Sequence, residues 1–403
     1  MLGRQFGWLW AAYAVSTAGT WLAFDAFPLI AILVLDSGPA AVSLLAAAGM
    51  AVAATLAIPL GPWVEFRRKR PVMIAMDLLR FAALMTVPVA YWLGWLTFAQ
   101  LLVVAVVVGA SDIAFRAASG ACLKALVPPE RLLLASARFE STTWTATAIG
   151  PPLGGALIGA FGPVVTVVVN AVSFVLSAVG IRAIGGGEPR PVVEASARGG
   201  LLEGWRFILS SPALRPLFFN TVLVAALILA TAPLLAVLML GELGFAPWQY
   251  ALAFGAPCVG GLIGARLSRR VVGRFGVHRV LLVAGTVRAC WSVGLAFVSA
   301  GAGGLALVLA VQFGLVTSMG VFNPVFAAHR LNAIPADRVA RVMAAWTVSS
   351  NATIAAMTAL WGLLAALVGA RSAIALAGVL LLATPLLLPR REGALQVAAA
   401  PAR

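Results

Sequence analysis

Three sets of charged residues lie inside long apolar stretches of this chain. The first is a single carboxylate, Asp25, in the stretch TWLAFDAFPL, with no cation within one helical turn. A charged group inside a bilayer is costly, and acidic residues at such depth commonly mark ion or proton pathways. Asp25 is therefore the first candidate for proton coupling. The alternative is an acid that reaches a water-filled cavity or pairs with an arginine from another helix.

The second set is Asp112 and Arg116, whose spacing of four residues places both on one face of a helix. They either neutralise each other or line a polar path, and Asp112 is the second candidate for proton coupling. The third set, Asp77 and Arg80, is three residues apart and also shares a helix face. A further acid, Glu140, lies in a later apolar stretch, where we expect a structural role.

The composition is that of an integral membrane protein. Of the 403 residues, 62% are hydrophobic and only 10% are charged, with a mean hydropathy of +1.03. Soluble domains of this size carry far more charge. The formal net charge of +15 does not indicate nucleic-acid binding, because the cations lie in short loops between apolar runs, where anionic lipid headgroups are their neighbours. No phosphate-binding loop, His/Cys metal cluster or catalytic triad pattern is present, so we expect no cofactor, no metal and no enzymatic activity.

Apolar segments of about 20 residues, the length that spans a bilayer, occur twelve times. The first has no cleavage site and is the first span, not a signal peptide. The segments are 7–35, 42–61, 72–95, 98–121, 133–160, 164–184, 216–240, 248–266, 280–300, 304–327, 340–367 and 372–389. The sequence therefore predicts an all-α membrane protein with twelve transmembrane helices.

One loop orients these spans. The run Arg67-Arg68-Lys69-Arg70 separates the second and third segments, and by the positive-inside rule it faces the cytoplasm. Apart from Arg371, the short turns at the opposite ends of the spans contain no lysine or arginine. This asymmetry predicts a multi-pass protein with both termini in the cytoplasm, and we expect the membrane to be a bacterial inner membrane.

The two halves of the chain repeat each other. The residues from Val280 to Arg288 match those from Val72 to Arg80 at an offset of 208 residues, and PADRVAR (335–341) matches PPERLLL (128–134) at an offset of 207. Four further pairs recur at 207: Ser111/Ser318, Phe115/Phe322, Gly155/Gly362 and Gly162/Gly369. A period of half the chain indicates two homologous halves in parallel orientation, an arrangement typical of transporters. The expected domains are two six-helix bundles (1–184 and 216–389), a cytoplasmic linker with a short amphipathic helix (185–215) and a cytoplasmic tail (390–403).

Twelve spans in two halves, a basic loop between spans two and three and a central linker resemble the major facilitator superfamily over nearly the whole chain. The loop motif of that family is G-x-x-x-D-R-x-G-R-R/K. The positions that match it are Gly61, Glu65, Lys69 and Arg70. Phe66 and Arg68 depart from it. By this resemblance we expect a cytoplasmic gate network of Gly61, Glu65, Lys69, Arg70, Asp77 and Arg80.

A second motif lies in the fifth span, where the stretch GPPLGG (150–155) resembles the end of the G-P-x-x-G-G motif associated with antiporters. Its matching residues are Gly150, Pro151, Pro152, Gly154 and Gly155. Ala137 and Ala146 stand where earlier glycines of the motif are expected, so a plain packing kink is the alternative. Together with LVPPERLLLASARFES, this stretch resembles the drug-efflux branch that includes macrolide and siderophore exporters.

The resemblance also implies that spans 1, 4, 7 and 10 surround the substrate path. The cavity candidates are Thr20, Phe24, Arg116, Glu140, Asn220, Gln312 and Asn323. Each polar member has an alternative role as a partner of its own helix backbone.

These features lead us to expect a monomeric secondary transporter that exports small lipophilic or amphipathic compounds, a drug or secondary metabolite, in exchange for protons. Its two halves would expose a midplane site alternately to each side. A proton-coupled importer and a lipid or lysolipid flippase of the same fold remain open. A non-transporting membrane receptor or scaffold is the alternative from another class.

Overall fold

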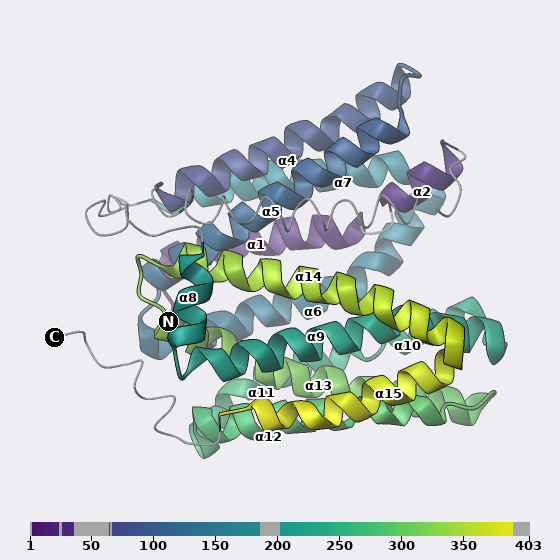
Figure 1. Ribbon diagram of the computed structural model, residues 1–403. Helices are drawn as coiled ribbons and strands as arrows, with labels where there is room; N and C mark the ends of the chain where they lie inside the picture. Colours follow the sequence, from purple (N-terminus) through teal and green to yellow (C-terminus); the bar gives the residue numbers. More distant parts are fainter. Residues whose placement is uncertain (1, 24–25, 36–63, 65–66, 186–201, 390–403) are drawn as a thin grey trace. The chain divides into compact units, whose positions relative to one another are not determined.

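Helices are the only regular secondary structure in the described residues of the computed structural model, which are 2–23, 26–35, 64, 67–185 and 202–389 (Figure 1). The first half contains α1 (Gly3–Leu22), α2 (Ala26–Leu33), α4 (Lys69–Trp92), α5 (Phe98–Leu126), α6 (Leu132–Phe161) and α7 (Pro163–Arg182). The short α8 (Glu203–Ser210) follows in the expected linker. The second half contains α9 (Leu214–Ala236), α10 (Pro247–Gly255), α11 (Cys258–Phe275), α12 (Val277–Cys290), α13 (Ala302–Ala333), α14 (Val339–Val368) and α15 (Ala370–Ala383).

Local signals in the sequence place several of these boundaries. The hydroxyl of Thr97 accepts a hydrogen bond of 3.2 Å from the backbone N–H of Gln100, so it caps the start of α5. Pro163 occupies the first turn of α7, where a missing N–H costs nothing. Pro257 stands directly before α11 and separates it from α10.

The apolar segments correspond to these helices with three differences. The expected span 7–35 is divided into α1 and α2, and 248–266 is divided into α10 and α11, with α11 continuing to Phe275. The expected span 280–300 consists of α12 and a following 3₁₀ helix, Ser292–Phe297. The expected span 42–61 lies outside the described residues. Within the part of the chain that is described, eight helical stretches are long and apolar enough to cross a membrane. They are Lys69–Trp92, Phe98–Leu126, Pro163–Arg182, Leu214–Glu242, Val277–Phe297, Ala302–Ala333, Val339–Val368 and Ala370–Leu387.

By its internal contacts the chain forms two compact units. Unit 1 is Met1–Arg131, Ala146–Phe207 and Ile334–Val348, and unit 2 is Leu132–Thr145, Ile208–Ala333 and Ser349–Arg403. The division differs from the halves expected from sequence at two helices, because α6 and α14 each contribute one part to each unit.

The internal repeat is visible in the backbone. Gly162, between α6 and α7, has φ 83° and ψ 163°, and Gly369, between α14 and α15, has φ 84° and ψ 156°. A positive φ of this kind is accessible to glycine and strained for residues with a side chain. The same unusual turn therefore joins the last two helices of each half.

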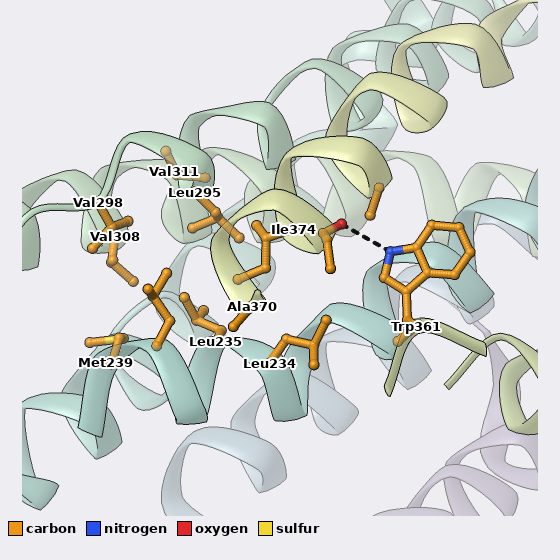
Figure 2. Packing of buried hydrophobic residues seen from close by; sticks show 14 of the residues in the cluster. Leu234, Leu235, Met239, Leu295, Val298, Val308, Val311, Trp361, Ala370 and Ile374 are labelled. Carbon is orange, nitrogen blue, oxygen red and sulfur yellow. Dashed lines mark hydrogen bonds between the residues drawn. The ribbon is translucent and has the colours of Figure 1, made fainter. Parts of the chain in front are cut away.

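Each unit has its own apolar core. In unit 1, Ile30, Leu84, Leu101 and Phe174 bring together α2, α4, α5 and α7. In unit 2, Figure 2 shows Leu234 and Leu235 of α9 facing Ile374 of α15, while the indole N–H of Trp361 donates to the carbonyl of Ala373 over 3.0 Å. This bond satisfies the one polar atom of a 4% exposed tryptophan and fixes the turn between α14 and α15.

Candidate functional site

Four charged side chains of α4 and α5 form a continuous chain of ion pairs in unit 1. Arg80 donates from Nη2 to Oδ1 of Asp77 over 2.5 Å and from Nη1 to Oδ1 of Asp112 over 3.3 Å. Arg116 donates from Nε to the other oxygen of Asp112, Oδ2, over 2.5 Å. The two pairs that sequence spacing treats separately are therefore one network, here called the four-charge chain. Its two acids and two bases sum to zero charge.

Solvent exposure rises along the four-charge chain. The two residues of α4 are 0% and 4% exposed, whereas Asp112 is 34% and Arg116 is 66% exposed. The buried guanidinium of Arg80 also lies over the rings of Phe115 and Phe174, with its Cζ 4.6 and 4.2 Å from their centroids. The network thus connects a fully buried acid to a pair of side chains that can meet a ligand or water.

Arg288, in α12, is the repeat counterpart of Arg80. Its side chain is 3% exposed, and its guanidinium lies over Phe322 at 3.6 Å. Phe322 is in turn the counterpart of Phe115, which lies under Arg80. Each unit therefore holds a buried arginine over the phenylalanine at the same repeat position.

The acidic partners differ between the units. In unit 2, Gly285 and Met319 occupy the positions that correspond to the two acids of the four-charge chain. Arg288 instead donates from Nη2 to Oδ1 of Asn220 over 2.5 Å, and the Nδ2 of Asn220 donates to the carbonyl of Thr384 over 2.8 Å. Among the residues that the structure describes, no carboxylate pairs with Arg288. Unit 2 thus retains the cation and has lost its counter-charges.

A third polar group lies in unit 2 around Glu140 of α6. Its Oε1 accepts from the indole N–H of Trp144 over 2.9 Å and from the Nδ2 of Asn323, in α13, over 2.8 Å. The Trp144 ring lies so close to α11 that a Cβ added at Gly261 would be 2.4 Å from it. Asn323 follows Arg116 by 207 residues, so the two occupy the same repeat position. In each unit the side chain at this position donates a hydrogen bond to a carboxylate.

The glycines of 150–155 have different environments. A Cβ added at Gly150 would lie 2.5 Å from the Cβ of Trp21, and one added at Gly154 would lie 2.1 Å from the backbone oxygen of Leu22. At Gly155 it would meet nothing within 4 Å. Two of the three glycines therefore allow α6 to touch the end of α1, and α6 continues as a helix through both prolines.

Comparison with known proteins identifies the family. Residues 9–329 match the family model described as Major Facilitator Superfamily. The chain belongs to the Major Facilitator Superfamily. It is therefore a multi-pass membrane transporter and not an enzyme.

The chain also resembles two proteins that are named multidrug efflux pumps. It is 27% identical over 278 residues to the multidrug efflux pump Tap of Mycobacterium tuberculosis (strain ATCC 25618 / H37Rv), covering 64% of this chain and 66% of that protein. It is 26% identical over 283 residues to the pump of the same name from Mycolicibacterium fortuitum, covering 67% and 68%. The match thus spans about two thirds of each relative.

Solved structures confirm the superfamily fold. A bacterial homologue of the iron transporter ferroportin, in an outward-facing state, has a TM-score of 0.81 at 17% identity, covering 96% of this chain and 98% of its own. The human organic anion transporter MFSD10 (TETRAN) has a TM-score of 0.74 at 16% identity, covering 96% and 100%. At these identities the likeness shows the fold alone.

The loop motif of the superfamily is described only in part. Gly61 and Glu65 lie outside the described residues. Lys69 donates from Nζ to the carbonyls of Val64 and Arg67 over 3.0 and 2.9 Å, and Arg70 donates from Nη1 to the carbonyl of Gly185 over 2.6 Å. The described end of the loop is thus held by backbone carbonyls.

The remaining cavity candidates are Thr20, Gln312 and Phe24. The hydroxyl of Thr20 donates to the carbonyl of Ser16, one turn earlier, over 2.8 Å. Gln312 lies half-buried on α13. Phe24 and Asp25 lie outside the described residues, so the role of Asp25 stays a prediction.

A contact network in unit 1 was missed by sequence reasoning. Glu203, in α8, forms ion pairs with Arg341, which is 3% exposed, and with Arg338 at 3.6 Å. A Cβ added at Gly204 would lie 2.5 Å from the backbone oxygen of Arg341, so α8 meets the start of α14 without an intervening side chain (Figure 1). Lys124 of α5 donates to the carbonyl of Ile334, just before α14. We call these contacts of Glu203 and Lys124 the α14 clasp.

Replacing Glu203 with glutamine should weaken the α14 clasp. The change removes the negative charge that Arg338 and Arg341 share, and a hydrogen bond to a charged group contributes about 1.5–3 kcal/mol. We expect a lower melting temperature of the purified protein and faster proteolysis after arginine within 334–348. Glu130→Gln, at an exposed acid that precedes α6, is the matched control. Equal behaviour of the two variants would show that the clasp contributes nothing.

The sequence predicts Asn220, Glu140 and Asn323 as cavity residues. It does not predict the hydrogen-bond partners that these side chains have in the structure. The one available signal was the repeat, since the offset of 208 already paired Arg80 with Arg288. Extended to the two acids of the four-charge chain, the repeat pairs Asp77 with Gly285 and Asp112 with Met319, so neither has an acidic counterpart.

Proposed function

We propose that this superfamily transporter exports small lipophilic or amphipathic compounds in exchange for protons, by alternating access. Two findings support export of such compounds: the relatives are named multidrug efflux pumps, and the chain belongs to a superfamily of transporters. The observation that carries proton exchange is the position of Asp112. Its carboxylate is shared by two arginines and is partly exposed.

The coupling step follows from that position. A proton on Asp112 would remove its charge and with it the ion pairs to Arg80 and Arg116. Arg80 would keep Asp77, whereas Arg116 would lose the only carboxylate that it contacts in the described residues. Protonation would therefore turn a neutral network into one with a net positive charge. That change disfavours a nearby cationic substrate and favours its release.

Glu140 is a second acid with the properties that coupling needs. It is held by two neutral donors, Trp144 and Asn323, with no described cation within ion-pairing distance. Protonation would add an O–H donor to the Glu140 carboxyl, which accepts hydrogen bonds from Trp144 and Asn323. The contact between α6 and α13 would then change. Asp25 remains the third candidate.

The test is transport of a fluorescent lipophilic cation into inverted vesicles, with and without an imposed proton gradient. For the wild type we expect gradient-driven accumulation. Asp112→Asn should reduce that accumulation at least tenfold and should leave gradient-independent counterflow intact, because asparagine keeps the size and the acceptor oxygen but cannot exchange a proton. Glu140→Gln and Asp25→Asn complete the set.

The outcomes separate the alternatives. Full gradient-driven accumulation by Asp112→Asn would exclude Asp112 as the coupling acid and transfer the role to whichever of the other two variants is uncoupled. Lipid movement between leaflets without flux of the cation would indicate a flippase. Accumulation only in right-side-out vesicles would indicate an importer, and no gradient-driven flux of any probe would indicate a receptor or scaffold.

We also propose that the transporter is a monomer of the bacterial inner membrane, with the basic run 67–70 and both termini on the cytoplasmic side. The concentration of arginine and lysine at one set of helix ends supports this orientation.

A further inference from the structure

An apolar groove of about 450 Å³ runs along the outside of unit 2. Its walls come from α11 and α12, and residues of α13 form its floor. Phe275, Val283 and Val287 line it and are 49%, 62% and 39% exposed. Helices α11 and α12 each pack extensively on α13 and touch each other little, which leaves the groove between them.

The polar groups at one end of the groove are already satisfied. Thr317 donates from its hydroxyl to the carbonyl of Phe313 over 2.6 Å, and Ser318 donates to the carbonyl of Gly314 over 2.7 Å. Ser318 also accepts from the indole N–H of Trp291 over 3.2 Å. This end of the groove therefore suits a hydrocarbon chain better than a polar ligand, because no new hydrogen bond is needed there.

The other end of the groove is basic. Arg279 lines it, and the guanidinium of Arg274 lies over Phe275 at 5.4 Å from the ring centroid. Three more arginines of α11, Arg266, Arg269 and Arg270, line a separate cavity of about 560 Å³. In the sequence no acidic residue occurs between Glu242 and Asp337. A strong positive field thus surrounds one end of an apolar groove.

The dimensions suit one lipid chain. From Arg279 to Val287 the helix α12 rises about 12 Å, at 1.5 Å per residue. That length corresponds to a large part of one leaflet of the hydrocarbon core, which is about 15 Å thick. A phosphate beside Arg279 would therefore place an acyl chain against the valines of the groove.

We propose that this groove is a binding site for one anionic phospholipid. The acyl chain lies along Val283, Val287 and Val321, and the phosphate contacts Arg279 and Arg274. The proposal concerns the outer face of unit 2 and does not depend on the exported compound or on proton coupling. Charge complementarity identifies the occupant, since a zwitterionic lipid gains less from the unopposed arginines.

The test is native mass spectrometry of the full chain after extraction from vesicles of phosphatidylcholine and phosphatidylglycerol in equal amounts. We expect one retained phosphatidylglycerol per protein, with at least a tenfold preference over phosphatidylcholine. Arg279→Gln should lower the retained amount about fivefold, the effect of one arginine near an anionic headgroup. Val283→Trp should block the groove and abolish retention.

Two matched controls accompany these variants. Arg371→Gln removes an arginine that donates to the carbonyl of Ala296, and Val379→Trp enlarges an exposed valine of α15 that does not line the groove. Both should retain the lipid as the wild type does. If Val283→Trp fails to fold, the proposal is tested by comparing the phosphatidylglycerol that Arg279→Gln and Arg371→Gln retain.

The proposal is overturned if phosphatidylcholine is retained as strongly as phosphatidylglycerol, or if Arg279→Gln and the folded Val283→Trp retain the wild-type amount. If a fluorescent lipophilic cation added to the wild type displaces the lipid, and Val283→Trp no longer retains that cation, the groove is assigned to a transported compound. If the wild type is a dimer and Val283→Trp is a monomer, the groove is assigned to a second copy of the chain.

Discussion

The variant Arg80→Met is expected to be about 3–5 kcal/mol less stable than the wild type, with a melting temperature about 5 °C lower in detergent. Arg80 is 4% exposed and neutralises Asp77, which is fully buried, while it also binds Asp112. Methionine fills most of the volume but leaves a buried carboxylate without its cation. A charge stranded in a low-dielectric interior is the costly result of breaking a buried ion pair. Thermal unfolding of the purified protein, followed by circular dichroism, measures the change.

Arg288→Met is the matched control, because Arg288 has the same burial and an equivalent aromatic neighbour. Its removal leaves the amide oxygen of Asn220 without a donor, at a cost of about 1–3 kcal/mol, but it also removes a buried charge. We therefore expect a net loss below about 2 kcal/mol. The double variant Asp77→Asn, Arg80→Met should recover part of the stability of Arg80→Met. Equal losses for Arg80→Met and Arg288→Met, with no recovery, would show that the acids do not depend on Arg80.

Gly154→Ala should damage the contact between α6 and α1. The added Cβ would lie 2.1 Å from the backbone oxygen and 3.0 Å from the backbone carbon of Leu22, and a backbone cannot yield as a flexible side chain does. Overpacking of this kind typically costs about 1–3 kcal/mol. We expect a lower melting temperature and a loss of gradient-driven flux of at least fivefold, since helix α1 must shift to accommodate the methyl group.

Gly155→Ala is the adjacent control. Its Cβ would meet nothing within 4 Å, and alanine is favoured over glycine in a helix by about 1 kcal/mol. The melting temperature should stay the same or rise, with wild-type flux. If both substitutions reduce flux equally, the stretch 150–155 acts through flexibility of α6 and not through close packing.

The sequence was a good guide wherever the information is local. Hydropathy placed both ends of α4 and α7 within about three residues, because lipid requires about 20 apolar residues in each span. It also placed the starts of α5 and α13, but both helices continue beyond the expected end. Spacings of three and four residues identified Asp77 with Arg80 and Asp112 with Arg116 as neighbours, and both ion pairs are present. These contacts depend only on the geometry of one helix.

Contacts between helices were beyond that reasoning. The bond from Arg80 to Asp112 joins two helices whose relative rotation is set by packing, which a single sequence does not display. Glu140 and Asn323 are 183 residues apart, so nothing local connects them. The break between α10 and α11 was not predicted, because one proline hardly changes the mean hydropathy of a span of about 20 residues. Pro257 is nevertheless a boundary signal, since the residue before a proline disfavours helical backbone angles.

An electric field across the membrane acts on the charge of Arg288, which no described carboxylate neutralises. The four-charge chain of unit 1 sums to zero, so moving it through an electric field requires no net work. Arg288 lies in a helix long and apolar enough to cross the membrane and has no described acidic partner. A full elementary charge crossing a potential of 100 mV does work of about 2.3 kcal/mol, so a displacement of about a tenth of the bilayer would be worth about 0.2 kcal/mol. The resting membrane potential would therefore act on any displacement of Arg288 relative to Glu140, an acid of unit 2 that is held by neutral donors.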